Sequence, residues 1–219
     1  MRIGTWNVEG RCGGEQSAII ESQSCDVWLL TEVSHRLVLP AGYHSTVGSA
    51  DMPRLNQRPF KRWAAVASRL PMAELPAPHP ASAGAVIEGV TLVSSVLPWS
   101  SSGGDPPWDG ANQAARMANT LTALAPFLAG QPELVWGGDW NQALSGREYA
   151  GSIAGRESLL ALINELGLEV PTAGLPHRIT PLLAIDHIAL RGGALRSQRI
   201  VAAKGGRRLS DHDMYVVEI

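Results

Sequence analysis

A carboxylate and a carboxamide follow one of the most apolar stretches of this 219-residue sequence. Leu134-Val135-Trp136 runs into two glycines, after which Asp139 and Asn141 alternate with Trp140. A period of two places Asp139 and Asn141 on one face of a strand and Trp140 on the other. The glycines let backbone or substrate approach closely. The pair could therefore hold a water molecule or a phosphate oxygen, although this segment taken alone favours a turn.

Polar side chains also close other apolar strands along the chain. A single acid at a strand end is usually a solvated cap, but strand ends at one sheet edge can converge on one cleft. The recurrence therefore indicates a shared site. Its candidate members besides Asp139 and Asn141 are Asn7, Glu32, Asp186, Asp211 and His212.

The elements that would position these residues alternate between strands and helices. Apolar runs predict strands at residues 2–8, 26–32, 63–68, 133–138, 182–190 and 214–219, and a strand or a hairpin at residues 85–96. Amphipathic spacing predicts helices at residues 15–24, 111–128 and 156–166. Residues 70–82 are expected to form a proline-rich connector, and residues 100–110 a surface loop. Short strands with few helices between them predict an α/β protein whose sheets pack face to face, with helices outside.

Composition restricts the class of protein. A hydrophobic fraction of 45% over residues 1–219 suits one globular domain. The apolar runs are too short for a membrane span, and the N-terminus has no hydrophobic signal core. We therefore expect a cytoplasmic protein without a membrane span. Cys12 and Cys25 have no metal-ligand spacing and are expected to be free thiols.

Positive charge is unevenly distributed although the net charge is -2. Two segments without acids hold most of the basic residues, which suits a phosphate-bearing substrate. Two solvated loops are an equally good interpretation. The basic residues are Arg54, Arg58, Lys61, Arg62 and Arg69 in one segment, and Arg191, Arg196, Arg199, Lys204, Arg207 and Arg208 in the other.

The polar pieces, in their order and spacing, resemble the endonuclease/exonuclease/phosphatase family, which has the DNase-I-like fold. The resemblance implies a four-layer α/β sandwich of two mixed β-sheets flanked by helices, and divalent-metal-dependent hydrolysis of a phosphate ester. The matching pieces run from residue 5 to residue 212: Thr5-Trp6-Asn7, Leu30-Thr31-Glu32-Val33, Gly138-Asp139-Trp140-Asn141, Ile185-Asp186-His187-Ile188 and Ser210-Asp211-His212.

The same resemblance implies roles for the candidate residues. Glu32 offers a hard oxygen ligand for Mg2+ or Mn2+, with Asn7 and Asp211 close by. Asp139 would orient or deprotonate the attacking water, and Asn141 would hold that water or a phosphate oxygen. His212 would contact the phosphate, with Asp186 fixing its tautomer and orientation. A buried structural pair is the alternative for Asp186 and His212.

One part of the sequence departs from the family pattern. The family usually carries a His or Tyr phosphate contact on its middle strand, where this chain has Leu97 or Pro98. Tyr43, His44 or an arginine of the basic loop could replace that contact. Otherwise the enzyme would be slow, would use a less demanding substrate, or would be a non-catalytic descendant.

The positions of the tryptophans and of His187 predict whether each side chain packs in the core or could contact a substrate. Trp6 and Trp140 flank the polar residues and are expected to pack in the core behind the site. Trp99 and Trp108, in or beside the loop at residues 100–110, are better candidates for stacking on a base. His187 should point to the face opposite Asp186 and be a packed histidine.

Three functions remain open from the sequence. The first is a nuclease cutting DNA or RNA, with substrate-binding residues Arg62, Arg207, Arg208 and Trp99. The second keeps the chemistry but acts on a small phosphoester such as a phosphorylated lipid head group or sugar, which suits the near-neutral charge and short chain. The third is a protein that binds a phosphate ligand without turnover, motivated by Leu97-Pro98.

Overall fold

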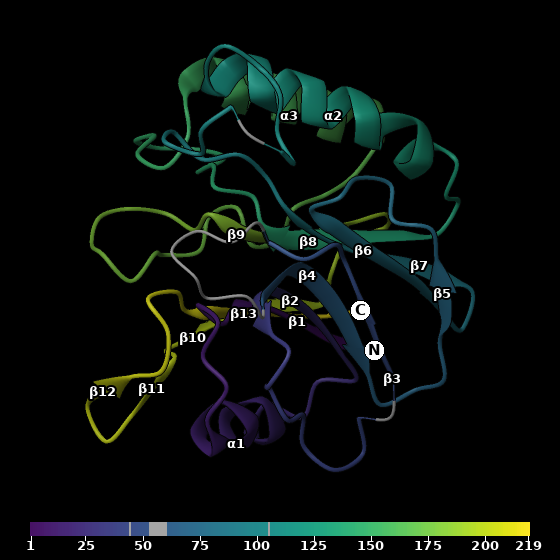
Figure 1. Cartoon of the computed structure of the whole chain (residues 1–219), viewed down its shortest axis with the longest axis vertical. Helices are drawn as coiled ribbons and strands as arrows, with labels where there is room; N and C mark the ends of the chain where they lie inside the picture. The colour runs from purple at the N-terminus through teal and green to yellow at the C-terminus, as the bar shows by residue number, and fades with distance from the viewer. Residues whose placement is uncertain (44, 53–60, 105) are drawn as a thin grey trace.

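Two β-sheets packed face to face form the centre of the molecule (Figure 1). The computed structural model describes residues 1–43, 45–52, 61–104 and 106–219. The first sheet has the strand order β10-β13-β1-β2-β4-β3. Its strands, in chain order, are β1 (Arg2–Asn7), β2 (Val27–Ser34), β3 (Ser45–Gly48), β4 (Lys61–Ser68), β10 (Arg196–Ile200) and β13 (Met214–Glu218).

The second sheet has the strand order β5-β6-β7-β8-β9. A separate two-stranded hairpin, β11 (Ala203–Lys204) with β12 (Arg207–Arg208), precedes β13. The β1–β2 and β7–β8 pairs are parallel and the other pairs antiparallel, so both large sheets are mixed. The strands of the second sheet are β5 (Ala73–Leu75), β6 (Ser82–Ile87), β7 (Val90–Val96), β8 (Leu134–Asp139) and β9 (Asp186–Leu190).

Helices cover both outer faces of the sandwich. In Figure 1, α1 (Gly14–Ser22) lies below the first sheet, and α2 (Gln113–Ala129) and α3 (Ile153–Glu165) lie above the second. Asn112 and Ser152 cap α2 and α3 by accepting hydrogen bonds from the backbone of the first turn. These layers confirm the four-layer sandwich predicted from the sequence. No helix in the described ranges is both long and apolar enough to cross a membrane.

Three apolar clusters hold the layers together. Ile3, Leu29 and Val66 of the first sheet pack between the sheets against Leu92 and Val135 of the second. The other two clusters join the second sheet to α2 and α3, and the first sheet to α1. Since burial of apolar area contributes about 25 cal/mol per Å2, the shared middle cluster fixes one sheet on the other.

Most predicted elements are confirmed, although some boundaries differ and several short strands were not predicted. The predicted connector at residues 70–82 contains the short edge strand β5. Of the two alternatives for residues 85–96, the hairpin is the one observed, as β6 and β7. β9 begins at Asp186, later than the strand predicted from residue 182, and β3 was not predicted. The helix predicted at residues 111–128 is α2 (Gln113–Ala129), which contains Pro126 and continues past it. The C-terminal basic segment holds β10, β11 and β12, none of which the apolar pattern had indicated.

Strand direction brings the polar ends to one edge of the sandwich. β4 and β13 run antiparallel to their neighbours β2 and β1, and β9 runs antiparallel to β8. The first residues of these three strands therefore lie beside the last residues of their neighbours. The candidate residues, far apart in the chain, meet at this edge.

Candidate active site

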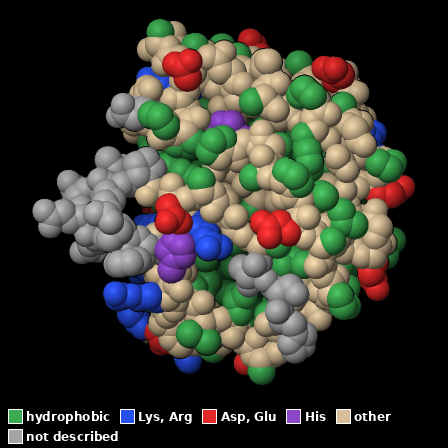
Figure 2. All heavy atoms as spheres, turned by 45° about the vertical axis from the view of Figure 1, so that its right-hand side comes forward, with side chains coloured by type: hydrophobic (Ala, Val, Ile, Leu, Met, Phe, Trp, Pro, Cys, Tyr) green, Lys and Arg blue, Asp and Glu red, His purple; other side chains and the backbone are tan. Residues whose placement is uncertain are grey.

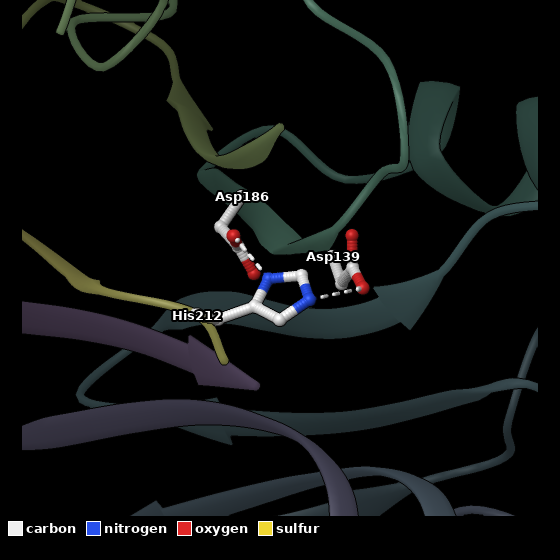
Figure 3. Close-up of side chains that lie close together, drawn as sticks. All are labelled: Asp139, Asp186 and His212. Carbon is white, nitrogen blue, oxygen red and sulfur yellow. Dashed lines mark hydrogen bonds and ion pairs between the residues drawn. The ribbon is translucent and has the colours of Figure 1, made fainter. Parts of the chain in front are cut away.

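Two aspartates and a histidine form the centre of the site (Figure 3). Asp139, the last residue of β8, lies opposite Asp186, the first residue of β9. His212 precedes β13 of the first sheet and reaches both aspartates of the second. Its Nδ1 lies 2.7 Å from Asp186 Oδ2, and its Nε2 lies 3.9 Å from Asp139 Oδ2. The site therefore spans the gap between the sheets.

The turn that carries His212 is anchored on β1. Ser210 is buried, and its hydroxyl donates a hydrogen bond to the Asn7 carbonyl at 2.6 Å. The same hydroxyl accepts the His212 backbone N–H at 3.1 Å. The serine of the Ser-Asp-His piece therefore fixes the backbone of His212 to β1 by these two hydrogen bonds.

Asn7 joins the carboxylates of the site. Its Nδ2 lies 3.0 Å from Asp139 Oδ2 and 3.2 Å from Glu32 Oε1, and its Oδ1 accepts the Glu9 N–H. The amide nitrogen therefore faces the acids and the oxygen is engaged by the backbone. This orientation gives Asn7 hydrogen bonds to two carboxylates through its nitrogen, while the oxygen that the sequence suggested as a metal ligand accepts a backbone N–H.

Glu32 points towards this network because the alternation of β2 breaks at that residue. Its φ of 50° lies in the left-handed region, and no ladder pair is formed between Glu32 and Trp63. Leu30 and Val33 then pack in the same outer cluster, although regular alternation would separate them. Such strain at non-glycine residues concentrates at functional sites.

The two glycines before Asp139 are required by close backbone approach. A Cβ at Gly137 would lie 2.6 Å from the His187 carbonyl oxygen, and one at Gly138 would lie 2.2 Å from the Ser95 oxygen. Gly138 also has a φ of +123°. The neighbouring strands therefore fit closely around β8 and fix the position of Asp139.

Asn141 is buried beside Asp139, with its own left-handed φ of 52°. Its backbone N–H donates to Asp139 Oδ1 at 3.1 Å, and its Nδ2 donates to the Leu97 carbonyl at 3.0 Å. The segment after β8 thus turns back on the carboxylate, which restricts the rotamer of Asp139.

The charges of the site shift its proton equilibria. Burial, followed by the charge of Asp186, raises the pKa of Asp139 to about 7, although His212 and the Asn7 hydrogen bond oppose this shift. Burial lowers the pKa of His212, but the charges of Asp186 and Asp139 outweigh it and raise that pKa to about 10. At neutral pH, His212 is a cation and Asp139 is poised to exchange a proton.

The residues that suit a metal ion are not the same as those of the His212–Asp186 charge pair. Asp139, Asp186 and His212 can place ligand atoms within 4.8 Å of one another. A protonated imidazole has no lone pair for a metal ion, so His212 in its pair with Asp186 is a poor ligand. The oxygen donors on the other side of Asn7, above all Glu32, suit a hard cation such as Mg2+ better.

Charge balance supports a cation at that position. Among the described residues, the carboxylates of the site outnumber its cationic groups, which are Arg11, Lys61 and His212. The carboxylates of Glu9, Glu32 and Asp211 are partly exposed and offer hard oxygen donors, so the residues present fit a divalent cation. The carboxylates are Glu9, Glu32, Asp139, Asp186 and Asp211.

Besides Arg11, three residues of the site were not identified from the sequence. Glu9 Oε2 accepts the Asp211 N–H at 3.0 Å, and Lys61 Nζ lies 3.3 Å from Glu32 Oε2. Tyr149 lies near enough to Asp186 and Asp139 that their charges, after burial, raise the pKa of its phenol. Glu9 could have been found from its place two residues after Asn7. Lys61 could be placed only with the pairing of β4 known, and Tyr149 only with the path of its loop known.

Two of the arginines expected to bind substrate are held in ion pairs by this chain. Arg208 pairs with the buried Asp213 and donates to the Ser210 carbonyl at 3.0 Å, which gives it a structural role in holding the His212 turn. Arg207 has 67% of its side chain exposed and pairs with Glu15 of α1.

The basic loop segment also differs from the expectation. Arg62 points to the outer face of the first sheet, where it lines a cavity of about 250 Å3 with His35 and lies 3.9 Å from Asp51. Arg54 and Arg58 lie outside the described residues. On the face drawn in Figure 2, most basic side chains of the described residues lie in the left half, with one group nearer the middle beside a histidine and acidic side chains.

The tryptophans of the loop form a cluster beside the end of β7. Trp99 is partly exposed and makes an edge contact with Trp108, with ring centroids 5.0 Å apart. Trp108 itself is buried and also packs on Trp63. Its stacking on a substrate base is therefore excluded in this conformation, whereas Trp99 keeps an accessible surface.

The other aromatic and histidine predictions are confirmed. Trp6 and Trp140 are buried in the clusters behind the site. His187 is buried against Trp140 and bonds to the Gln142 carbonyl and Thr172, as expected for a packed histidine. Both cysteines are free thiols.

The middle strand supplies no side-chain phosphate contact among its described residues. Leu97 is buried in the cluster under α2, and Val96 faces the tryptophans. Tyr43 is not a replacement, because its hydroxyl donates to the Cys25 carbonyl at 2.6 Å and accepts from Trp28 at 3.0 Å on the outer side of the first sheet. His44 lies outside the described residues.

Solved structures with this fold cover almost the whole chain. A 3'-5' exonuclease from Neisseria meningitidis has a TM-score of 0.71 at 20% identity, with 100% of this chain and 99% of that chain covered. A Neisseria 3' phosphatase bound to a product DNA hairpin gives 0.71 at 18% identity, covering 100% and 99%. An AP endonuclease from Archaeoglobus fulgidus gives 0.71 at 16% identity, covering 99% and 98%. At these identities the likeness concerns the fold.

The sequence itself matches a family model. No curated protein matches the chain significantly. The model described as "Endonuclease/Exonuclease/phosphatase family" matches residues 4–212, which include every polar piece identified above. The chain therefore belongs to the endonuclease/exonuclease/phosphatase family of phosphoester hydrolases.

Proposed function

We propose that this chain is a divalent-metal-dependent phosphodiesterase that cleaves DNA or RNA. The observation that carries this proposal is the convergence of Asp139, Asp186 and His212 with Asn7 and Glu32 at one edge of the two sheets. Its support as a nuclease comes from the fold neighbours, which include an exonuclease, an AP endonuclease and a phosphatase bound to DNA.

Asp139 is the proposed general base. Its pKa of about 7 suits proton transfer near neutral pH, since the best catalytic pKa lies close to the operating pH. Asn7 and the Asn141 backbone N–H each bond one oxygen of this carboxylate. Asp139 would accept a proton from the attacking water, with the Asn141 side chain close by to orient the water or a phosphate oxygen.

His212 is the proposed phosphate contact. Its Nδ1–H donates to Asp186, which fixes the orientation of the ring. Its Nε2 lies 3.9 Å from both Asp139 Oδ2 and Asp211 Oδ1, beyond hydrogen-bond distance. The cationic Nε2–H is therefore available to a phosphate oxygen that enters between these two carboxylates.

Glu32, Asp211 and Glu9 are the proposed ligands of Mg2+ or Mn2+. The Asp211 side chain is 53% exposed and that of Glu32 is 30% exposed, so both present oxygens towards solvent. When bound, the metal ion would offset negative charge on the phosphate oxygens and the leaving group. Asn7 would hold Glu32 without ligating the ion, through the hydrogen bond from its amide nitrogen.

Substrate contacts are proposed for Trp99 and Arg207. Trp99 lies shortly after the end of β7, beyond Leu97 and Pro98, and its exposed surface could stack on a base or sugar. Arg207 would contact a backbone phosphate after releasing Glu15, an exchange that costs little because exposed ion pairs are weak.

Hydrolysis assays test the proposal. A panel of single- and double-stranded DNA, RNA, a chromogenic phosphodiester and a phosphomonoester would be incubated with Mg2+, Mn2+ or EDTA. We expect nucleic-acid cleavage that EDTA abolishes and that Asp139→Asn and His212→Gln each reduce by about 10^2 to 10^4. Asp109→Asn, at an exposed loop position, is the matched control.

A small phosphoester is the second candidate substrate. The ion pairs of Arg62, Arg207 and Arg208 leave less free positive charge than the sequence had indicated. Cleavage of only the small esters in the panel would establish this candidate. No turnover of any ester would favour a binding protein and make the unreplaced middle-strand contact the central feature.

A further inference from the structure

Lys61 places an ammonium group against the proposed metal ligand Glu32. Its Nζ lies 3.3 Å from Glu32 Oε2 and 3.3 Å from the carbonyl oxygen of Glu9. Glu32 is bonded on its other oxygen to Asn7, which is bonded in turn to Asp139. Lys61 is therefore the outer end of the network that contains the proposed catalytic residues.

The chain makes room for this lysine at Gly10. A Cβ at Gly10 would lie 1.9 Å from Lys61 Cε and 2.6 Å from its Nζ, and Gly10 has a φ of +65°. The lysine stem therefore lies flat against a residue that has no side chain. The backbone conformation that favours glycine and the space it leaves both serve the position of Lys61.

The strand pairing explains why Lys61 and not Arg62 reaches the site. Lys61 begins β4 opposite Ser34 of β2, and the break in alternation at Glu32 turns that carboxylate to the side of Lys61. Arg62 points to the outer face of the sheet. The Lys61 side chain is 31% exposed, the end of its stem passes over Gly10, and its ammonium contacts the Glu32 carboxylate and the Glu9 carbonyl, which fixes the position of the charge.

A placed positive charge beside a carboxylate has two opposite effects on a metal ion. It holds the carboxylate in position, and it repels any second cation that binds the same group. Two unit charges about 5 Å apart have a Coulomb energy comparable with the thermal energy even at the dielectric constant of water. This energy is twice as large when one of the charges is a divalent ion. At this half-exposed position, the repulsion alone corresponds to roughly tenfold in metal affinity.

We propose that Lys61 is a positioning residue of the metal site, which holds Glu32 and weakens its affinity for the divalent cation. This inference rests on the proposed function, because it requires Glu32 to be a metal ligand. It predicts that the site exchanges its metal ion more readily than its carboxylates alone would allow.

Metal binding measured without turnover tests the inference. The purified full chain, stripped with EDTA and exchanged into metal-free buffer, would be titrated with Mn2+ while free Mn2+ is followed by electron paramagnetic resonance. We expect Lys61→Met and Lys61→Gln to bind Mn2+ roughly tenfold more tightly than the wild type. Lys61→Arg, which keeps the charge, should bind within about twofold of the wild type.

Two controls separate the possible outcomes. Lys204→Met removes the other lysine of the chain, at an exposed position in β11, and should leave Mn2+ affinity unchanged. Glu32→Gln should abolish tight binding, and if it binds like the wild type, the proposed metal site itself is wrong. If binding depends on Glu32 but the Lys61 variants bind equally or more weakly, or if Lys61→Arg binds as tightly as Lys61→Met, the inference is overturned while the proposed function stands.

Discussion

Asn7 Nδ2 lies 3.0 Å from Asp139 Oδ2, so that one hydrogen bond joins the end of β1 in the first sheet to the end of β8 in the second. The same nitrogen lies 3.2 Å from Glu32 Oε1. The neutral amide of Asn7 thus donates to both carboxylates, Glu32 and Asp139, and bridges two groups that would otherwise repel each other. This geometry assigns to Asn7 the spacing between the proposed base and the proposed metal ligand.

Replacement of Asn7 by alanine should therefore impair turnover more than substrate binding. We expect kcat to fall about a hundredfold, since misplacement of a reacting group by about 1 Å can cost that much, with a smaller change in KM. Steady-state kinetics on the best substrate of the panel would measure both. Asn119→Ala, at an exposed position in α2, is the matched control. Equal kcat values for Asn7→Ala and wild type would show that the amide does not position the base.

The protonation of His212 provides a test that needs no substrate. Its pKa of about 10 should keep the ring doubly protonated at pH 8, whereas burial lowers the pKa of His187 to about 4 and should keep that ring neutral at pH 5. Ring nitrogen chemical shifts, followed by nuclear magnetic resonance across this pH range, would report both. Because the charge of Asp186 contributes to the raised value, Asp186→Asn should move the His212 titration towards neutral pH.

The raised pKa of His212 also determines how the free energy of unfolding depends on pH. An unfolded histidine titrates near about 6.5, below the folded value of about 10. The stabilisation from the charged His212 is therefore complete below pH 6.5 and is lost as the pH rises towards 10. A neutral His212 ring at pH 8 would contradict the charge pair with Asp186.

Asp213 should contribute to stability in the opposite pH range. Burial raises its pKa, but the Ala202 N–H and the guanidinium groups of Arg208 and Arg199 outweigh this and lower it. Its stabilisation is therefore complete above the unfolded value of about 3.9 and is lost as the pH falls through the folded value. At pH 7, Asp213→Asn should lower the free energy of unfolding by about 3–5 kcal/mol, because two arginines lose their buried partner.

Arg207→Met is the comparison for this change. Arg207 is exposed and pairs at the surface, so its loss should cost at most about 1 kcal/mol. Urea unfolding at pH 7 and at pH 4 would compare the two variants. An equal loss for both at pH 7 would mean that the Asp213 ion pairs do not anchor the turn that carries His212.

The polar ends of the strands could be predicted because they follow from short-range rules. An apolar run predicts a strand, its last polar residue predicts an edge position, and several such residues predict a shared site. Asp139, Asp186 and His212 were found in this way, and the structure brings them together. The two glycines before Asp139 also fulfil the predicted close approach of neighbouring backbone.

Contacts between distant segments could not be predicted from the same rules. The break in alternation at Glu32 and the pairing of β4 place Lys61 in the site and Arg62 outside it, although they are adjacent in sequence. Arg208 was expected to face substrate, but a buried carboxylate five residues later holds it. A count of basic residues gives no information about which of them already have partners.

The apolar cluster between the two sheets indicates that they unfold together. Ile3, Leu29 and Val66 of the first sheet share an apolar cluster with Leu92 and Val135 of the second. Exposure of this cluster by separation of the sheets would cost most of the stability of either half. We therefore predict a single cooperative unfolding transition for residues 1–219.

Two cavity-forming variants on opposite faces test this prediction. Ile20 of α1 and Leu159 of α3 are both fully buried, in clusters on opposite outer faces of the sandwich. Ile20→Ala and Leu159→Ala should each lower the free energy of unfolding by about 2–5 kcal/mol. In each variant, far-ultraviolet circular dichroism and tryptophan fluorescence should report the same midpoint, because the shared cluster couples the two faces. Two separated midpoints in either variant would instead establish that each sheet, with its own helices, unfolds as an independent unit.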